Sequence, residues 1–577
     1  RKNQMLLEKK QVTPLIRCLF IFIVALFAFL PSLDNGFVDW DEKDLLLENP
    51  LVQEQPFSNI KEIFTTATEG RYYPLTMLVY QVEYFFFRSQ PLGYHIVDLF
   101  LHLINVALVF MLLGLLGLNA TVVFLTTLFF AIHPMQVESV AWAASLKDVL
   151  FVCFYLLAMI FYVKGKRDFT SGCVSQACVA IFFLLALCAK SMAVTLPAVL
   201  LLIDVYFDKK LTFQKFAQKI PLFILAFMFS MVAIKAAEGI AGFPLTKVFS
   251  VFDRVLLSSL ALCVYIAKIF VPLRLSCLYP FPKPWEGLGP WDLYLSLVAV
   301  AGFMFLFVHK KGCWQKGRLA FLFFLVTLLP VLHLVEVNTS FIYERFVYLP
   351  SIGFFLLLAI AWEAAMNHWG KRFPAVRYGV KILLVGFVGF LWIATFTRCL
   401  VWKNSLTLWD DAVSKFPQSV SARISRGNAL SARGQQTLAF IDFDVAVAIR
   451  PTSALAYFNR AGMYANVYKN YERAIEDYTS ALQHPFNDPT MRAKTYLNRG
   501  LVYTFQRRFD LALQDYEKVV NLEPQNKIVR LNRAIVYYKQ GRNQEALVDI
   551  EIILENFPKD YLAQEFQEKI LKKQRVR

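Results

Sequence analysis

Apolar residues fill long runs over the first two thirds of the chain, and charged residues return at short intervals from about Trp402 onward. A helix needs ~20 apolar residues to cross a bilayer, and the first run, 15–33, approaches that length. Other apolar runs lie near 95–117, 120–133, 146–163, 174–189, 192–207, 219–236, 253–273, 291–308, 319–335, 346–366 and 378–398. We therefore expect a polytopic membrane domain over residues 1–400, in which the shorter helices are tilted or broken.

Basic residues lie mainly in short loops between these runs, at 164–167, 209–215, 309–318 and 371–377. Cytoplasmic loops carry such an excess of Lys and Arg, so we expect a cytoplasmic N-terminus and an uncleaved first span. The segments expected on the outer face are the long loop 34–93, 134–147, Lys190, 336–345 and everything after Arg398. Residue 208 is expected on the inner face and 277–290 on the outer face, so an odd number of crossings must lie between them. Only two apolar runs are present there. We prefer about eleven crossings in all, with 237–252 re-entrant or interfacial unless one run does not cross.

The rest of the chain, 401–577, repeats with a period of about 34 residues. Prolines end successive units, and each unit has one small residue in its first helix and an Ala in its second. These positions are Pro451, Pro485, Pro524 and Pro558; Gly427, Ala461, Gly500 and Ala534; and Ala439, Ala474, Ala512 and Ala546. The pattern is typical of tetratricopeptide repeats. It predicts about four repeats, roughly 419–452, 453–486, 492–525 and 526–559. The fold class is therefore all-α, a transmembrane helix bundle followed by an α-solenoid.

One polar position recurs in the repeats. Asn459, Asn498 and Asn532 are equivalent, and Ser425 takes the same place in the first repeat. Identical side chains in stacked repeats form a ladder, and an amide can both donate to and accept from a peptide backbone. The ladder could bind an extended acceptor polypeptide, or the Asn-Arg pair could simply belong to the repeat's own structure.

Composition narrows the class of protein. Hydrophobic residues make up 57% of the 577 positions, which is too apolar for an ordinary soluble protein. The net charge of +17 arises from short clusters between apolar runs and not from one coherent face, so nucleic-acid binding is not expected. The nine Cys residues lie before Trp402 and show no metal-ligand spacing.

Ionisable and aromatic residues gather on the expected outer face, beginning with the carboxylates of GFVDWDEKDLLLENP. The set comprises Asp39, Asp41, Glu42, Arg71, Tyr73, Tyr94, Asp98, His102, His133, Glu138, Lys147, Asp148, Lys190, Glu344 and Arg345. Charges at a membrane are costly and are usually functional. Structural alternatives stay open: His133 could cap a helix end, Asp98 and His102 could pair between helices, and Glu344–Arg345 could be interfacial.

The order of several motifs resembles one family. WDE, RYYPLT, GYHIVDLFLH, HPMQVESVAW with LKD, AKSMAVTLPAVLLLID, ERFVYLPSIG and VWKNSLTLWDDAVSKFP precede the repeats. They are similar to the transmembrane and tetratricopeptide-repeat O-mannosyltransferases of the GT-C glycosyltransferase superfamily, and the KSMAVTLP form is more like the bacterial relatives. The chain departs from the pattern at Leu146, where Arg is expected, and at Asp98, where Asn is more usual.

The resemblance implies a membrane enzyme that takes a sugar, with mannose the first expectation, from a polyprenyl-phosphate carrier on the outer face and passes it to Ser or Thr hydroxyls. An acidic residue of the first outer loop is then the catalytic candidate, which maps to Asp41, followed by Glu42 and Asp39. For the donor phosphate the candidates are Arg345, then Lys147, Lys190 and Arg71. The expected donor or sugar pocket comprises Tyr73, Tyr94, Asp98, His102, His133, Glu138, Asp148 and Glu344.

A carboxylate can act as general base toward the attacking hydroxyl, and a phosphate leaves without protonation. A single base with inversion is therefore the simplest mechanism. No cofactor is certain; the carboxylates at 39–42 could offer oxygen ligands to a divalent ion, but the sequence shows no complete metal site.

Two other functions fit this architecture. One is a non-catalytic membrane scaffold whose repeats recruit protein partners on the outer face. The other is a carrier that moves a lipid-linked sugar across the bilayer, a class that usually shows internal symmetry of its spans, and no such symmetry is visible here. We expect a bacterial inner membrane with periplasmic repeats, with an endoplasmic reticulum membrane and lumenal repeats as the alternative.

Overall fold

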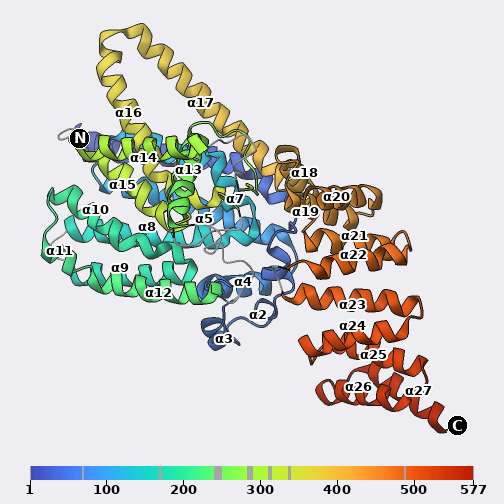
Figure 1. Ribbon diagram of the computed structural model, residues 1–577. Coiled ribbons are helices and arrows are strands. Elements are labelled where there is room, and N and C mark those ends of the chain that lie inside the picture. Colours follow the sequence, from blue (N-terminus) through green and yellow to red (C-terminus); the bar gives the residue numbers. More distant parts are fainter. Residues whose placement is uncertain are drawn as a thin grey trace. The chain divides into compact units, whose positions relative to one another are not determined.

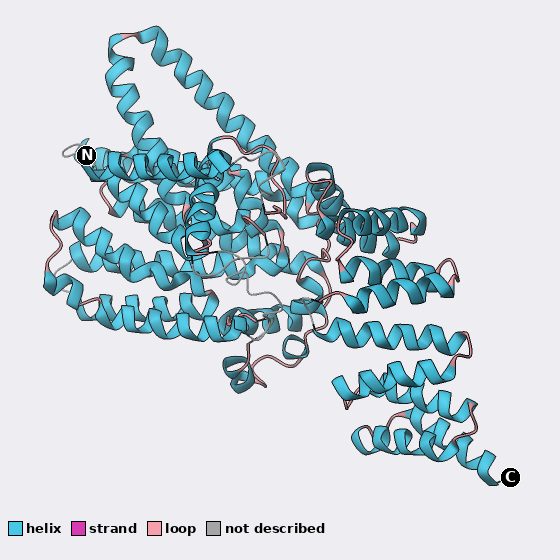
Figure 2. Cartoon of the chain, viewed as in Figure 1, coloured by secondary structure: helices cyan, strands magenta, loops and turns pink. Residues whose placement is uncertain are grey.

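The structure is a computed structural model that describes residues 2–67, 70–167, 172–238, 250–281, 290–309, 315–334, 340–486 and 489–575. Over these ranges the regular elements are helices, and no strand occurs among them (Figures 1 and 2). The chain forms two compact units, of which the first extends to Lys415 and the second comprises residues from Phe416 onward. The predicted all-α class is confirmed.

Helices of different lengths, most of them long, build the first unit. They are α1 (Lys2–Phe29), α4 (Pro74–Phe87), α5 (Pro91–Leu115), α6 (Ala120–Ile132), α7 (Val137–Ala141), α8 (Leu146–Arg167), α9 (Gly172–Ala189), α10 (Leu196–Asp208), α12 (Ile220–Glu238), α13 (Val251–Phe270), α14 (Pro290–His309), α15 (Gln315–Leu328), α16 (Ser351–Arg372), α17 (Pro374–Val401) and α18 (Ser405–Lys415). Three short helices complete it, α2 (Pro50–Gln53), α3 (Ile60–Thr65) and α11 (Phe213–Ala217). Local sequence signals explain where several helices begin. Asn119 caps the N-terminus of α6. A proline is the first residue of α4, α5 and α17, where its missing N–H costs nothing.

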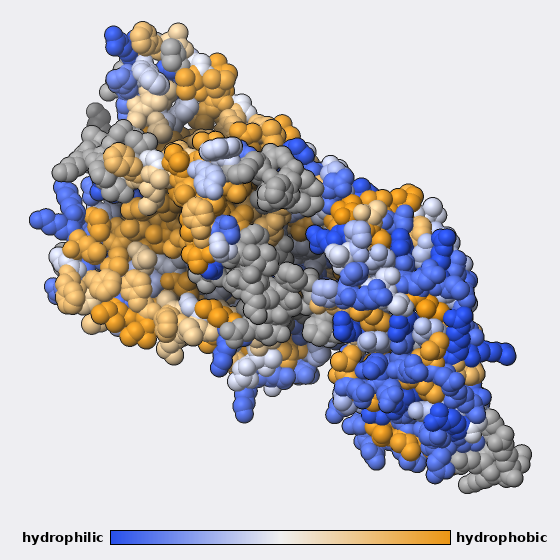
Figure 3. Space-filling model, viewed as in Figure 1, coloured by the Kyte–Doolittle hydropathy of each residue, from blue (hydrophilic) through white to orange (hydrophobic). Residues whose placement is uncertain are grey.

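Seven helices of the described ranges are long and apolar enough to cross a membrane. They are Pro14–Asp34, Pro91–Leu115, Ala143–Arg167, Gly172–Ala189, Ser191–Asp208, Ser351–Trp369 and Arg377–Val401. An eighth is added if α6 and Pro134–Ala141, which meet at 51°, form one broken span. The chain is therefore a multi-pass membrane protein, and hydrophobic side chains dominate the visible face of the first unit (Figure 3).

The remaining predicted runs, 219–236, 253–273, 291–308 and 319–335, correspond to α12, α13, α14 and α15, which do not belong to that set of seven. The crossing count of about eleven stays a prediction. Most of the segment expected to be re-entrant, 237–252, lies outside the described residues.

The second unit consists of four successive helix pairs and a last helix. Its helices are α19 (Val420–Ala432), α20 (Gln436–Ile449), α21 (Ala454–Asn466), α22 (Tyr471–Gln483), α23 (Pro489–Phe505), α24 (Phe509–Leu522), α25 (Lys527–Lys539), α26 (Asn543–Asn556) and α27 (Tyr561–Arg575). The small residues lie where the paired helices touch. A Cβ added to Gly427 would come within 2.5 Å of the Phe443 ring, and one added to Gly500 within 2.6 Å of Tyr516. Larger side chains at these positions would force the helices apart.

One ion pair joins the two helices of every repeat. In each, the arginine Nε and Nη2 atoms each donate to one oxygen of the same carboxylate, a two-pronged geometry that fixes both side chains. The pairs are Arg426–Asp442 at 2.7 Å, Arg460–Asp477 at 2.8 Å, Arg499–Asp515 at 2.7 Å and Arg533–Asp549 at 2.7 Å. The arginine of the recurring Asn-Arg sequence thus serves the repeat's own structure.

Removing one of these carboxylates should destabilise its repeat. Asp549 is 1% exposed and accepts hydrogen bonds from both Arg530 and Arg533. Asp549→Ala leaves two guanidinium groups unpaired, at a cost of about 3 kcal/mol. Hydrogen exchange of the α25 and α26 amides in the full chain should then accelerate by about 100-fold. The matched control is Glu545→Ala, which breaks the exposed Arg542–Glu545 pair and should change exchange less than about fivefold. Equal effects of the two substitutions would contradict this account.

Candidate active site

Several separate segments of the first unit bring charged side chains to one place, which we call the charged cluster. Its members are Asp41 and Glu42 after α1, Arg71 before α4, Glu138 on α7, Lys147 and Asp148 in the first turn of α8, Lys190 between α9 and α10, and Arg345 in the helical turn Glu344–Val347. Lys147 is close enough to interact electrostatically with four other members. Asp148 and Asp41 attract it, and Arg71 and Arg345 repel it. All four phosphate-binding candidates therefore lie in the same cluster as the first-choice carboxylate.

The loop that carries Asp41 is tied to the end of the membrane bundle. The backbone N–H of Asp39 donates to Ser405 Oγ at 2.8 Å, and the rings of Trp40 and Trp409 meet edge to face with centroids 4.9 Å apart. Asp39 itself is exposed to solvent. These contacts fix the backbone next to Asp41, and they come from α18, far away in the sequence.

Glu42 is locked into the protein interior. Its side chain is 1% exposed, one carboxylate oxygen accepts from the backbone N–H of Val38, and the other accepts from Ala143 N at 3.1 Å. Burial, and to a smaller degree the charge of Asp41, raises the pKa of Glu42 to about 8, against the opposing hydrogen bonds from backbone N–H groups. Glu42 therefore joins the first loop to the α7–α8 connection, and both of its oxygens are occupied.

Asp41 differs from Glu42 in its access to solvent. Its side chain is 32% exposed, and its ion-pair partner, Arg71, lies 3.4 Å away and is 46% exposed. A pair of half-exposed groups at this distance is weakly held. Asp41 is thus the carboxylate of the 39–42 motif that lies in the charged cluster with an oxygen open to an incoming molecule.

The other carboxylates of the charged cluster are each held by a cation. Glu138 pairs with the Arg345 guanidinium and also accepts from the Arg345 backbone N–H at 3.0 Å, and Asp148 pairs with Lys190. Burial lowers the pKa of Arg345, but the charges of Glu138, Asp148 and Asp41 outweigh it and raise that pKa above its ordinary value. Both pairs are almost fully buried, so each carboxylate largely neutralises its partner.

Lys147 is the exception among the cations. Its ammonium group donates to the Ala144 carbonyl and lies 5.2 Å from the Trp142 ring centroid and 6.0 Å from that of Tyr73. Within the described part of the chain, no carboxylate forms an ion pair with it. Its nearest partners are a neutral carbonyl and aromatic rings, and Asp148 and Asp41 act on it only from a distance, so a bound anion would supply the direct counter-charge that it lacks.

Trp142 lies beside two cations of the charged cluster, Arg345 and Lys147, and it was not among the site residues expected from the sequence. The Arg345 guanidinium lies 5.1 Å from the Trp142 ring centroid, nearly the same distance as the Lys147 ammonium. The indole also stacks on Trp402 with centroids 5.8 Å apart. The signal was visible in the motif HPMQVESVAW, where this aromatic residue stands between Glu138 and Lys147.

Two buried acids lie near the charged cluster. Glu83 on α4 and Asp98 on α5 are 3% and 1% exposed, and neither carboxylate has a hydrogen-bond partner among the described residues. They interact electrostatically with each other, and Asp98 also with Glu42, Lys147 and Asp148. Asp98 was expected to line the donor pocket, and the structure puts it beneath the charged cluster. Glu83 was not anticipated, because nothing in its local sequence distinguishes a buried acid from a solvated one.

The other expected pocket residues make separate contacts. His102 binds Tyr348 Oη at 2.7 Å and the Ala131 carbonyl at 3.1 Å, and Tyr94 donates to the Arg88 carbonyl at 2.8 Å.

His133 accepts from Met135 N at 3.3 Å and lies 3.0 Å from the Ile269 carbonyl, so it caps the turn that breaks the span. Glu344 points away from its neighbour Arg345, accepts from Tyr279 Oη and Ser276 N at 2.6 Å each, and lies 3.7 Å from Arg398. The structure therefore brings neither residue into the charged cluster.

The carboxylates at 39–42 do not converge on a common point, because Glu42 is occupied by backbone N–H groups and Asp39 is exposed. Among the described residues, no group of three or more His, Cys, Asp or Glu side chains is arranged to hold a metal ion.

The amide ladder of the second unit is half-buried at each of its positions. Asn459 Nδ2 donates to the Leu455 carbonyl at 2.9 Å, and Asn498 interacts with the Tyr478 hydroxyl. Both amides keep part of their hydrogen-bonding capacity for another molecule, since each can make several hydrogen bonds.

The chain is similar to one repeat family and to several known proteins. A model of the family described as "Tetratricopeptide repeat" matches residues 493–526. "Protein O-mannosyl-transferase F38B6.6" of Caenorhabditis elegans is 24% identical and aligns with 73% of this chain and 61% of its own length. "Protein O-mannosyl-transferase TMTC4" of Mus musculus is 23% identical and aligns with 73% of this chain and 65% of its own length. Among solved structures, the crystal structure of the MamA protein is 22% identical, with a TM-score of 0.24, over 26% of this chain and 80% of that chain.

The predicted resemblance is thus confirmed as homology over most of the chain to proteins named O-mannosyl-transferases. The chain spans less than two thirds of the length of the two relatives.

The raised pKa of Glu42 makes a prediction about pH. The folded protein retains this proton up to a pH of about 8, whereas an unfolded Glu loses it near its ordinary value of about 4.5. The stabilising contribution is therefore complete below about pH 4.5 and is lost as the pH rises toward 8. The protection factors of the Val38 and Ala143 amides, which correct the exchange rates for their intrinsic rise with pH, should fall over this window. Glu42→Gln should flatten the dependence while the protein stays folded; an unchanged slope in that variant would assign the effect to another group.

Proposed function

We propose that this chain is a GT-C glycosyltransferase that moves a sugar, mannose in the first instance, from a polyprenyl-phosphate carrier to Ser or Thr hydroxyls of proteins. One observation carries the proposal: the charged cluster joins a carboxylate open to solvent, Asp41, to an ammonium group that no described carboxylate neutralises, Lys147. The names of the relatives support the choice of sugar and acceptor. Orientation follows from the basic loops, which favour the charged cluster and the repeats on the outer face.

In the proposed step, Asp41 accepts the proton of the acceptor hydroxyl as its oxygen forms a bond to the anomeric carbon of the sugar. The bond between that carbon and the phosphate oxygen breaks, and the phosphate leaves with the electron pair. Because the hydroxyl attacks from the side opposite the phosphate, the configuration at the anomeric carbon is inverted. Glu42 keeps the loop of Asp41 in place and takes no proton from the substrate.

The leaving phosphate gains charge as the bond breaks, and a cation near it lowers the barrier. Lys147 is better suited than Arg345, because Arg345 is already neutralised by Glu138. This reverses the order expected from sequence. Lys190, paired with Asp148, and the half-exposed Arg71 stay secondary candidates.

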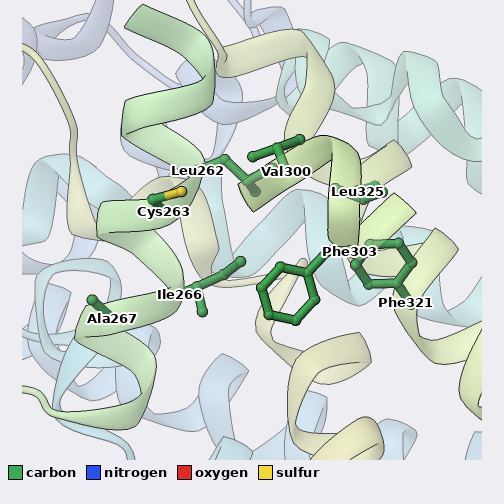
Figure 4. A pocket seen from close by; sticks show the side chains of 8 residues that line it. All are labelled: Leu262, Cys263, Ile266, Ala267, Val300, Phe303, Phe321 and Leu325. Atoms are coloured by element: carbon green, nitrogen blue, oxygen red, sulfur yellow. The ribbon is translucent and has the colours of Figure 1, made fainter. Parts of the chain in front are cut away.

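The hydrocarbon chain of the donor needs an apolar binding surface, and a cavity of about 230 Å³ between α13, α14 and α15 offers one (Figure 4). Its wall consists of apolar side chains and one cysteine, such as Leu262, Cys263, Phe303 and Phe321. On α13, Tyr265 binds the backbone of Tyr343, whose ring lies 3.9 Å from the Arg345 guanidinium. A carrier lipid in this cavity would therefore lie on a helix that contacts the charged cluster.

We assign acceptor binding to the repeats, with the amides of Asn459, Asn498 and Asn532 holding an extended polypeptide by its backbone. The setting we favour is a bacterial inner membrane with periplasmic repeats. The scaffold hypothesis is the alternative, and it assigns no chemical role to Asp41 or Lys147.

Asp41→Asn tests the general base. Purified protein in nanodiscs should transfer sugar from a polyprenyl-phosphate donor to a Ser/Thr peptide, and this substitution should lower kcat by about 10²–10⁴-fold. Binding of the donor should change little, because the carboxylate acts on the acceptor. Asp44→Asn, an exposed acid in the same loop, is the control and should retain full activity. Transfer at the normal rate by Asp41→Asn would move the role away from this residue.

Lys147→Met tests the phosphate site. The substitution preserves an unbranched side chain of similar length and removes the charge, so donor binding should weaken by about 10- to 100-fold. Titration of the donor with each variant measures this directly. Lys61→Met removes an exposed charge from α3 and should bind the donor normally. Unaltered donor binding in Lys147→Met, or no transfer by the wild type with any donor, would favour the scaffold hypothesis.

A further inference from the structure

A second cavity opens at the opposite end of the bundle, and the proposed reaction does not use it. It measures about 580 Å³ and lies where the ends of α5 and α10 meet α15 and α16. Leu116, Phe207 and Ile360 form an apolar part of its wall, whereas Lys209, Lys316 and Asn367 supply polar groups. The cavity thus combines an apolar surface with two ammonium groups.

The length of α8 shows how far this cavity lies from the charged cluster. Lys147 stands in the first turn of this helix and Arg167 ends it, a separation of about 30 Å at 1.5 Å per residue. That is the thickness of a bilayer's hydrocarbon core. The Arg167 end is next to the cavity, because a Cβ added to Gly117 would lie 3.5 Å from Arg167 Nη2, and Gly117 follows the lining residue Leu116.

The walls of the cavity are fixed by hydrogen bonds between its helices. Gln315 Nε2 donates to the Tyr206 carbonyl at 2.7 Å, and Tyr206 Oη donates to the Leu116 carbonyl at 3.1 Å. These two bonds connect α15 to α10 and α10 to the end of α5. The space is therefore preformed between packed helix ends.

Charge distinguishes this cavity from its surroundings. Nearby, Lys166 and Lys219 pair with Asp204, and Lys166 and Lys215 with Asp208. By contrast, Lys209, Lys316 and Arg167 have no ion-pair partner in the described ranges. The one carboxylate of the wall, Glu363, accepts a hydrogen bond from the Asn119 amide. Among the described residues at this place, Lys209, Lys316 and the adjacent Arg167 outnumber the single carboxylate of Glu363, which leaves a net positive charge.

Lys209 also occupies an unusual backbone position. It directly follows the last residue of α10 and has a φ of 59°, in the left-handed region where glycine is the ordinary choice. A lysine there carries conformational strain that a glycine would relieve. A side chain that is useful in the cavity would explain its presence.

We propose that this cavity binds the headgroup of an anionic phospholipid from the leaflet opposite the charged cluster. The phosphate lies between Lys209, Lys316 and Arg167, and the first methylene groups of the acyl chains lie against Phe207 and Ile360. Basic pockets between transmembrane helices on the cytoplasmic side bind such headgroups, and the basic loops favour that side for this end of the bundle.

Native mass spectrometry of the full chain with phosphatidylglycerol tests the site. The wild type should retain bound phosphatidylglycerol in preference to phosphatidylcholine. Lys209→Gln combined with Lys316→Gln should weaken binding by about 30-fold, at roughly fivefold for each charge near the membrane surface. Ala364→Trp should fill the cavity and weaken binding without changing any charge. Lys210→Gln, which removes the neighbouring charge outside the cavity wall, is the matched control and should bind normally.

Three outcomes would overturn the proposal. Equal losses in Lys210→Gln and the double variant would indicate diffuse attraction to anionic lipid. Full binding by Ala364→Trp would place the lipid elsewhere. Displacement of phosphatidylglycerol by inorganic phosphate at equal concentration would identify a site for a soluble anion.

Discussion

The cost of placing a charge in the low-dielectric interior of a helix bundle governs the first unit. Even after relaxation, each unpaired ion costs several kcal/mol, so buried charges must find partners, and the partners come from distant parts of the chain. Asp148 with Lys190 and Glu138 with Arg345 join loops around the charged cluster, and Asp204 joins two lysines at the far end of α8. These pairs determine which loops meet. The same constraint makes Lys147 conspicuous, since it is buried without a carboxylate of its own.

Features that depend on the spacing of residues within one segment could be predicted from the sequence. The repeats and most apolar runs depend on spacing along one segment, and the loops that form the charged cluster were assigned to one face by their charge pattern. Contacts from distant segments could not be predicted. Asp41 and Glu42 are adjacent carboxylates. The backbone N–H of Ala143 holds Glu42 in the interior, whereas Asp41 stays accessible to solvent. Glu344 and Arg345 diverge for the same reason, because Tyr279 and Ser276 draw the glutamate away.

Aromatic rings position the cations of the charged cluster without neutralising them. A carboxylate that positions a cation also neutralises it, whereas an indole orients a cation and leaves its charge available. Trp142 lies beside both Arg345 and Lys147, and its stack on Trp402 connects them to the end of α17. The phosphate binding that we propose for this site would gain from this arrangement, because the attraction is moderate and directional.

The ion pair of each repeat has a consequence for how such a chain can change over evolutionary time. Arginine and aspartate come from the two helices of one repeat, as in Arg499–Asp515. A whole repeat can therefore be duplicated or deleted with its own Arg–Asp pair still balanced, although deletion of the first repeat would cost Arg460 its second partner, Asp444. The repeat number becomes a quantity that selection can adjust in steps of about 34 residues. The reach of the array toward the acceptor polypeptide that we propose can then lengthen or shorten while the membrane unit is unaltered.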